Sequence, residues 1–190
     1  MNNRELVREV KEYLGSEFRT GHPQKEYKRG EDYIEFYIKS EFYLIANAQH
    51  DVPKEIEQVK GKVLDFGGGS GHVSIKLAEN NCFVDYIDIN KRQQGFVKWI
   101  AKKYKLNINV IEEPKKEYDW IILRDVIEHL IDYPTTLKKL FKHLKKDGKI
   151  YAKPEWCSNV LHFKDENNFP VFMRDQGFEE TEKLIWRRMK

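Results

Sequence analysis

The sequence predicts an α/β fold built on a mostly parallel β-sheet, and two patterns carry this prediction. From Lys62 onward, short apolar runs alternate with amphipathic segments, as is typical of parallel strands connected by helices. A glycine-rich turn at residues 67–71 directly follows an apolar run that resembles a buried strand. We therefore expect a Rossmann-like sheet of about six or seven strands, with helices on both faces and an N-terminal helical cap.

Hydrophobic periodicity places each element along the chain. Residues 3–14 have helical spacing, residues 31–49 are apolar around most of a long helix, and Pro53 is expected to start a short helix. Strands are expected at residues 62–66, 82–88, 107–111, 118–123 and 149–153, and helices near residues 71–80, 91–104 and 134–147. A last helix over residues 165–177 should end at Gly177, before one or two strands in residues 178–189.

Length and composition suit a single compact domain, in which we expect a cap at residues 1–60 and a core at residues 61–190. The net charge of +3 is too balanced to demand a polyanionic partner. Cys82 and Cys157 lack metal-site spacing and suit a reducing compartment. A polar N-terminus and the lack of a long apolar run predict no signal peptide and no membrane partner, hence a cytoplasmic protein.

Residues 63–71, Val-Leu-Asp-Phe-Gly-Gly-Gly-Ser-Gly, form the most informative motif. Glycines let backbone N–H groups approach a ligand, and a helix starting near His72 adds a donor-rich, partly positive end. Asp88 closes the next apolar run, and a carboxylate about 20 residues beyond such a loop can accept from both hydroxyls of a ribose. This order indicates a site for a nucleoside cofactor.

The glycine spacing distinguishes between nucleoside cofactors. Gly67, Gly69 and Gly71 give G-x-G-x-G, whereas dinucleotide sites have G-x-G-x-x-G, whose third glycine is here replaced by His72. Asp65, just before the loop, would repel a pyrophosphate but suits a cofactor that carries an ammonium and a sulfonium. A nicotinamide dehydrogenase is therefore disfavoured.

The loop resembles motif I of the class I S-adenosylmethionine-dependent methyltransferases, and residues 88–90, Asp-Ile-Asn, resemble their second motif. Residues 118–130 look like motif IV, and residues 144–150 and 176–178 are similar to the segments before strands five and six. The resemblance implies S-adenosylmethionine as the cofactor, bound by Asp65, Gly67, Gly68, Gly69, Gly71, Asp88 and Ile89.

Four further residues are expected to contact the cofactor on the same resemblance. Glu112 and Glu113 follow the third strand, where an acceptor for the adenine amino group is usual; the alternative is a solvated turn before Pro114. Arg124 and Asp125 end the fourth strand, and their backbone is expected to meet the methionine part of the cofactor. The Arg124 side chain has two further interpretations, pairing with a substrate acid or with Asp125.

The candidate catalytic residues are Glu128, His129 and His162. Asp125-x-x-Glu128-His129 resembles the Glu-x-x-Glu-His of two metal-dependent O-methyltransferase groups, one acting on ubiquinone precursors and one on the 3′ end of small RNAs. Asp125, Glu128, His129 and His162 have the ligand chemistry for Mg²⁺, Mn²⁺ or Zn²⁺. Similar sequences occur widely in the superfamily without a metal, with Glu128 and His129 lining the pocket, and we expect no metal here.

The implied reaction is in-line displacement at a sulfonium methyl by a small-molecule acceptor. The protein would align the nucleophile and exclude water, and a base such as His129 or His162 is needed only if a proton must leave. An alternative is an RNA methyltransferase acting on a 2′-oxygen or a base, for which residues 25–29 and Arg187-Arg188 provide positive charge. A second alternative is a non-catalytic cofactor-binding subunit.

Overall fold

The computed structural model describes residues 1–15, 42–115, 117–156, 165 and 168–189. Helix α1 spans Asn3–Leu14, where Asn2 and Glu5 cap each other's backbone in a capping box. Helix α3 spans Phe42–Ala48, so most of the helix predicted over residues 31–49 lies outside the described residues. The short helix predicted at Pro53 is the 3₁₀ helix η3, Lys54–Gln58.

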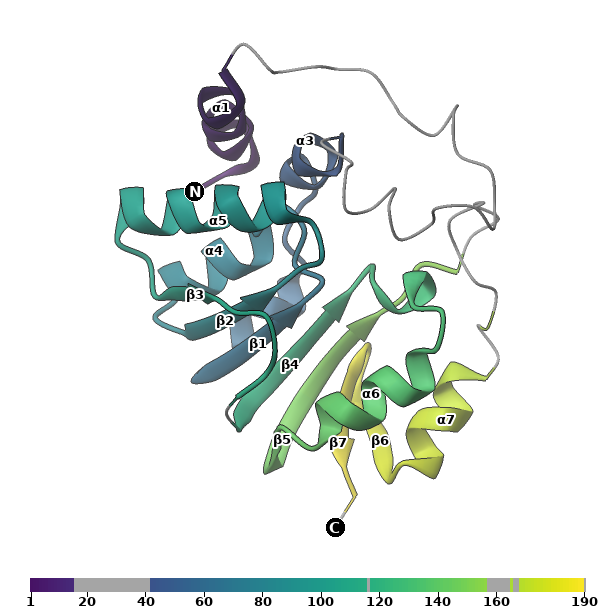
Figure 1. The fold of residues 1–190 in the computed structure, drawn as a ribbon. Helices are drawn as coiled ribbons and strands as arrows, with labels where there is room; N and C mark the ends of the chain where they lie inside the picture. Colours follow the sequence, from purple (N-terminus) through teal and green to yellow (C-terminus); the bar gives the residue numbers. More distant parts are fainter. Residues whose placement is uncertain (16–41, 116, 157–164, 166–167, 190) are drawn as a thin grey trace.

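Strands and helices alternate from residue 62 onward, which confirms the α/β class (Figure 1). The remaining elements are β1 (Lys62–Phe66), α4 (His72–Glu79), β2 (Phe83–Ile87), α5 (Lys91–Tyr104), β3 (Ile108–Val110), β4 (Tyr118–Arg124), η4 (Ile127–His129), α6 (Tyr133–Phe141), β5 (Leu144–Lys153), α7 (Phe169–Asp175), β6 (Phe178–Glu182) and β7 (Ile185–Arg188). None of the described helices is long and apolar enough to cross a membrane.

The sheet has seven strands in the order β3-β2-β1-β4-β5-β7-β6. Strands β1 to β5 pair with one another in parallel, and β7 is antiparallel to both β5 and β6, so the sheet is mostly parallel, as predicted. From β1 the chain moves outward through β2 to β3, then returns to β4 on the other side of β1. In open α/β sheets such a reversal marks the crevice where ligands bind, and here it falls at the carboxyl ends of β1 and β4.

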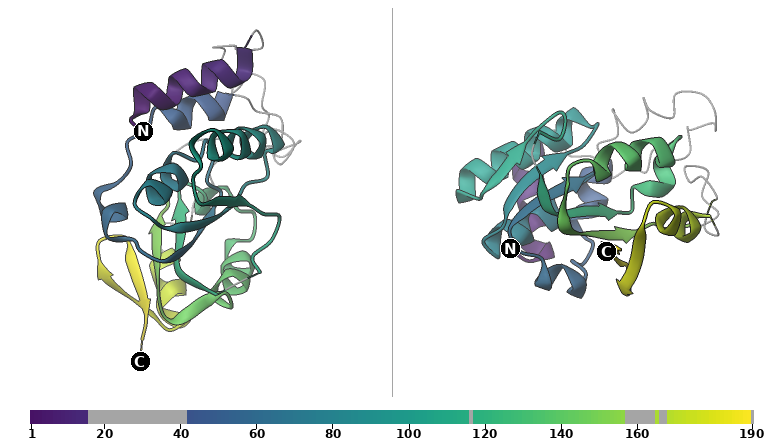
Figure 2. Two further views of the ribbon diagram at one scale, coloured as in Figure 1. Left: turned by 90° about the vertical axis from the view of Figure 1, so that its left-hand side faces the viewer. Right: turned by 90° about the horizontal axis from the view of Figure 1, so that it is seen from below.

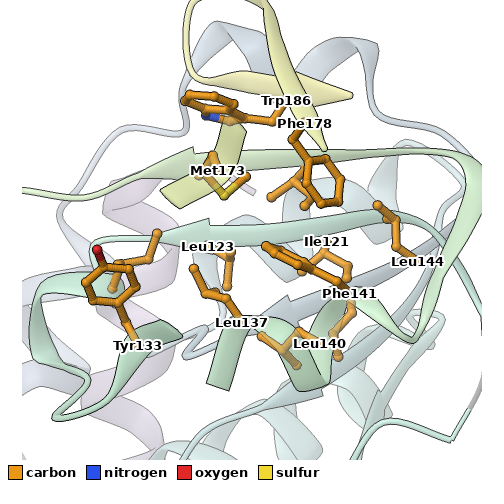
Figure 3. Close-up of a cluster of buried hydrophobic side chains, with 14 of the residues drawn as sticks. Ile121, Leu123, Tyr133, Leu137, Leu140, Phe141, Leu144, Met173, Phe178 and Trp186 are labelled. Atoms are coloured by element: carbon orange, nitrogen blue, oxygen red, sulfur yellow. The ribbon is translucent and has the colours of Figure 1, made fainter. Parts of the chain in front are cut away.

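Alternating side chains of β4 divide the core between the two faces of the sheet. Trp120 and Ile122 pack with residues of η3 and α4, whereas Ile121 and Leu123 pack with residues of α6 and α7. Figure 3 shows this second cluster, in which Leu137 of α6 and Met173 of α7 lie against the strand residues. Helices therefore cover both faces, as the sequence predicts.

Helices α1 and α3 lie side by side next to α5 (Figure 2). Leu6 and Val10 of α1 and Leu44 of α3 share one buried cluster with Phe96 of α5. Lys103 Nζ also bridges α5 to α1, lying 2.6 Å from a carboxylate oxygen of Glu9 and 2.8 Å from one of Glu12. The described part of the predicted cap is therefore packed onto the core, and a domain boundary at residue 60 stays a prediction.

The predicted helix over residues 134–147 is wrong in its second half. Helix α6 ends at Phe141, and Leu144 already belongs to β5, where it pairs with Tyr118. A bulge in this pairing separates Leu144 from the regular ladder that resumes at Lys149. Leu144 has helical spacing relative to Leu137 and Leu140, yet it reaches the same hydrophobic cluster from the strand.

Candidate cofactor site

The loop between β1 and α4 is a tight glycine turn bonded to the neighbouring strand. Gly67, Gly69 and Gly71 have φ angles of 71°, 55° and 73°, which L-residues with side chains rarely adopt. The N–H groups of Gly67 and Gly68 both donate to the carbonyl of Ile87, at 2.8 and 3.2 Å. The loop therefore lies against the carboxyl end of β2, as the predicted order of strand, turn and acid requires.

Asp88 lies directly beyond β2 and faces this loop. Its Oδ2 accepts from the Gly69 N–H at 2.9 Å, and its Oδ1 accepts from the Asn90 N–H at 2.8 Å. An ionised carboxylate is an acceptor-only group, which can accept from two neighbouring hydroxyl groups. Ile89, next to it, is 53% exposed and offers an apolar surface that suits one face of a purine.

Asp65 is a buried carboxylate beneath the loop. It is 2% exposed, and its Oδ2 accepts from Ser74 Oγ at 2.6 Å. A Cβ placed on Gly68 would lie 2.8 Å from the same oxygen, so the backbone passes directly over the carboxylate. Burial raises the pKa of Asp65 to about 6, so the group is mostly ionised at neutral pH and complements a cation.

Arg124 and Asp125 lie at the carboxyl end of β4, as predicted. Arg124 Nε is 3.2 Å from Asp125 Oδ2, and Lys153 Nζ is 3.6 Å from Asp125 Oδ1. The Asp125 backbone has a φ of 50° and donates to the Lys153 carbonyl. Of the two interpretations of the Arg124 side chain, pairing with Asp125 is therefore observed, and Arg124 Nη1 also contacts Nε2 of His72 on α4.

Glu112 and Glu113 lie in an exposed turn after β3. The Glu112 carboxylate forms an ion pair with Lys91 Nζ at 2.8 Å, which holds it near the start of α5, close to Asp88 in sequence. Both partners are largely exposed, at 65% for Lys91 and 71% for Glu112. A contact from either glutamate to adenine stays a prediction.

The structure describes two of the three catalytic candidates, Glu128 and His129. Glu128, in η4, is fully buried, and neither carboxylate oxygen has a hydrogen-bond partner among the described residues. Burial raises the pKa of Glu128 to about 7. His129 is half-buried beside it, whereas His162, Cys157 and the basic residues 25–29 lie outside the described residues.

The described residues contain no group of three or more His, Cys, Asp or Glu side chains that could bind a metal ion. Asp125, Glu128 and His129 therefore do not form such a group by themselves. Because His162 is outside the described residues, the four-residue metal set stays untested.

Three residues that the sequence analysis did not select support the loop. Tyr86 OH donates to the Gly69 carbonyl at 2.6 Å, and Ser74 holds Asp65 as described above. Asn47 of α3 approaches so closely that a Cβ on Gly69 would lie 2.4 Å from its side-chain nitrogen. No alternation in β2 singles out Tyr86, because nearly the whole strand is buried, and the position of Asn47 depends on how α3 docks.

The seven-stranded sheet, the glycine turn at its switch point and the acid on the neighbouring strand together define a Rossmann-like, class I methyltransferase domain. Comparisons with known proteins agree with this class. A family model described as "Methyltransferase domain" matches residues 37–179, and the chain belongs to this family. S-adenosylmethionine is the cofactor on which the family depends.

Two relatives indicate the chemistry found in similar sequences. The chain is 28% identical over 156 residues to (S)-tetrahydroprotoberberine N-methyltransferase of Eschscholzia californica, covering 75% of this chain and 43% of that protein. It is 33% identical over 96 residues to a ubiquinone biosynthesis O-methyltransferase of Pelagibacter ubique (strain HTCC1062), covering 47% of this chain and 40% of that protein. The chain thus spans less than half the length of these relatives.

A solved structure supports the fold. Magnesium protoporphyrin IX methyltransferase from Synechocystis PCC 6803, crystallised with S-adenosylhomocysteine (SAH), aligns with a TM-score of 0.62 at 14% identity. The alignment covers 81% of this chain and 97% of that one. At this identity the likeness concerns the fold alone.

Proposed function

We propose that this protein is an S-adenosylmethionine-dependent methyltransferase that acts on a small-molecule acceptor. The observation that carries the proposal is the pairing of the Gly69 N–H with Asp88, which joins the glycine turn and the ribose-type acid in one crevice. The N- and O-methyltransferase names of the two relatives favour a small acceptor over a nucleic acid.

The residues of the crevice fit the cofactor by chemistry. Asp88 would accept from the ribose hydroxyls, and exposed Ile89 would cover the adenine, with Glu112 or Glu113 as acceptor for its amino group. Gly67, Gly68, Gly69 and Gly71 bring the backbone close to the amino-acid end, and the Asp65 carboxylate favours its ammonium. When bound, the cofactor supplies a methyl group already activated by the sulfonium.

The protein then has to orient the acceptor, exclude water and, for a protonated nucleophile, take up a proton. Glu128 is the described residue best suited as base, because its pKa of about 7 lies near working pH. His129 and His162 remain the other candidates. Residues 1–60 are proposed as the lid, since α3 already brings Asn47 against the loop.

Titration calorimetry with SAH tests the proposal. We expect micromolar binding by the wild-type protein and a loss of about tenfold or more in Asp88→Asn, because the diol would lose a charged acceptor. Asp175→Asn, an exposed position at the end of α7, is the matched control and should bind like the wild type. Unchanged affinity in Asp88→Asn would refute the ribose assignment, and absence of wild-type binding would refute the function.

A methyl-transfer assay tests the acceptor class separately. Labelled cofactor would be incubated with a panel of small amines and phenols, and with a structured RNA. Transfer to small molecules is expected; transfer to RNA alone would favour the alternative activity. Tight cofactor binding without transfer to any substrate would favour a non-catalytic subunit.

A further inference from the structure

Arg124 is a cation placed in the crevice between β1 and β4. Its side chain is 10% exposed, and its charge is close enough to Asp65 to lower the pKa of that carboxyl. A carboxylate and a guanidinium therefore lie near each other at the switch point of the sheet. This arrangement complements a ligand that carries an ammonium and a carboxylate on one carbon.

The pairing of Arg124 with Asp125 leaves donors unused. Although Nε lies 3.2 Å from Asp125 Oδ2, it makes no hydrogen bond with the described residues, and Asp125 Oδ1 is also without one. The Asp125 carboxylate also forms an ion pair with Lys153, whose Nζ lies 3.6 Å from Asp125 Oδ1. A guanidinium has five N–H donors, so the described contacts leave Arg124 with capacity to bind an anionic group.

His72 holds this guanidinium from the first turn of α4. Its Nε2 contacts Arg124 Nη1, and its Nδ1 lies 3.3 Å from Ser70 Oγ. Burial, together with the Arg124 charge, lowers the pKa of His72 to about 3, so the ring is neutral. A neutral ring that donates from Nδ1 to Ser70 has a free Nε2 lone pair, which accepts from Arg124.

We propose that the Arg124 side chain, positioned by His72, binds the α-carboxylate of the cofactor's amino-acid end. This inference rests on the proposed function and deepens it, since the resemblance implied only backbone contacts at Arg124. It also explains the residue at position 72, where a dinucleotide site would have glycine. His72 is a positioning residue here, because it acts through the guanidinium.

Two probes separate this role from a structural one. SAH carries the α-carboxylate, and 5′-methylthioadenosine lacks the whole amino-acid end. The variants are Arg124→Gln, which removes the cation, His72→Leu, which removes the acceptor, and His72→Gln, which keeps an acceptor. His143→Leu, between α6 and β5 at the amino end of β4 and so at the opposite end of that strand from Arg124, is the matched control.

We expect Arg124→Gln and His72→Leu to weaken SAH binding by about tenfold or more, as for loss of a charged hydrogen bond. Binding of 5′-methylthioadenosine should change less than about twofold, and His72→Gln should restore most SAH affinity. The control should bind both probes like the wild type.

Equal losses for both probes, or unchanged SAH binding, would overturn the proposal. A His72→Gln variant as weak as His72→Leu would overturn the positioning role. Circular dichroism verifies folding, and the His72 pair still decides the question should Arg124→Gln not fold. A wild-type protein that binds neither probe refutes the proposed function instead, so the two failures are distinguishable.

Discussion

Glu128→Gln is predicted to stabilise the protein above neutral pH and to have little effect under acidic conditions. The Glu128 carboxyl is fully buried, and this burial outweighs the effect of the backbone N–H groups of Glu128 and Glu155, so the charged form is costly. Glutamine has nearly the same shape and stays neutral. The variant therefore mimics the protonated acid at every pH.

The magnitude follows from the pKa. Burial moves the pKa of Glu128 from 4.5 to about 7, and each unit of difference between the folded and unfolded pKa corresponds to about 1.4 kcal/mol of stability. Between these values the unfolded chain has released a proton that the folded protein keeps, so the free energy of unfolding falls as pH rises. Between pH 4.5 and pH 8 the free energy of unfolding of the wild type should fall by about 3 kcal/mol relative to that of Glu128→Gln.

Urea unfolding of both proteins across this pH range measures the difference. Asp65 and Asp88 also have raised pKa values, but they titrate in both proteins and cancel in the comparison. Glu57→Gln, on the exposed side of η3, is the matched control and should give a difference that does not change with pH. A flat difference for Glu128→Gln would refute the argument that burial of this carboxyl penalises its charged form.

Two further predictions concern the glycine loop. Gly67→Ala should lower the free energy of unfolding by about 1–3 kcal/mol more than Gly177→Ala does. Both glycines have a positive φ, but only a Cβ at Gly67 would meet a neighbouring side chain, that of Val126, at 2.4 Å. Equal urea midpoints for the two variants would contradict this. SAH binding should weaken as pH falls through about 6, where Asp65 gains a proton and no longer attracts the ammonium. Asp65→Asn should bind SAH weakly at every pH. If calorimetry finds that this variant keeps the pH dependence of the wild type, Asp65 is not the group that causes it.

Local patterns were sufficient for most of the fold and for the backbone of the site. Apolar periodicity predicted α1 and α5 with their observed bounds, and the glycine spacing predicted the turn that brings Gly69 within hydrogen-bond distance of Asp88. The same kind of pattern failed at Leu144, because its spacing suits a helix while its backbone pairs with Tyr118. Hydrophobic spacing reports that a residue is buried, not which element buries it.

The sequence by itself determined the α/β class and the glycine turn with its acid, because these depend on residues close together in the chain. Only the tertiary structure decided the partners of charged and polar side chains in the crevice. Arg124 meets His72 across a separation of 52 residues, and Asn47 reaches Gly69 through the docking of α3. Such contacts arise from strand order and helix packing, and each involves residue types that would be equally compatible with a solvent-exposed position.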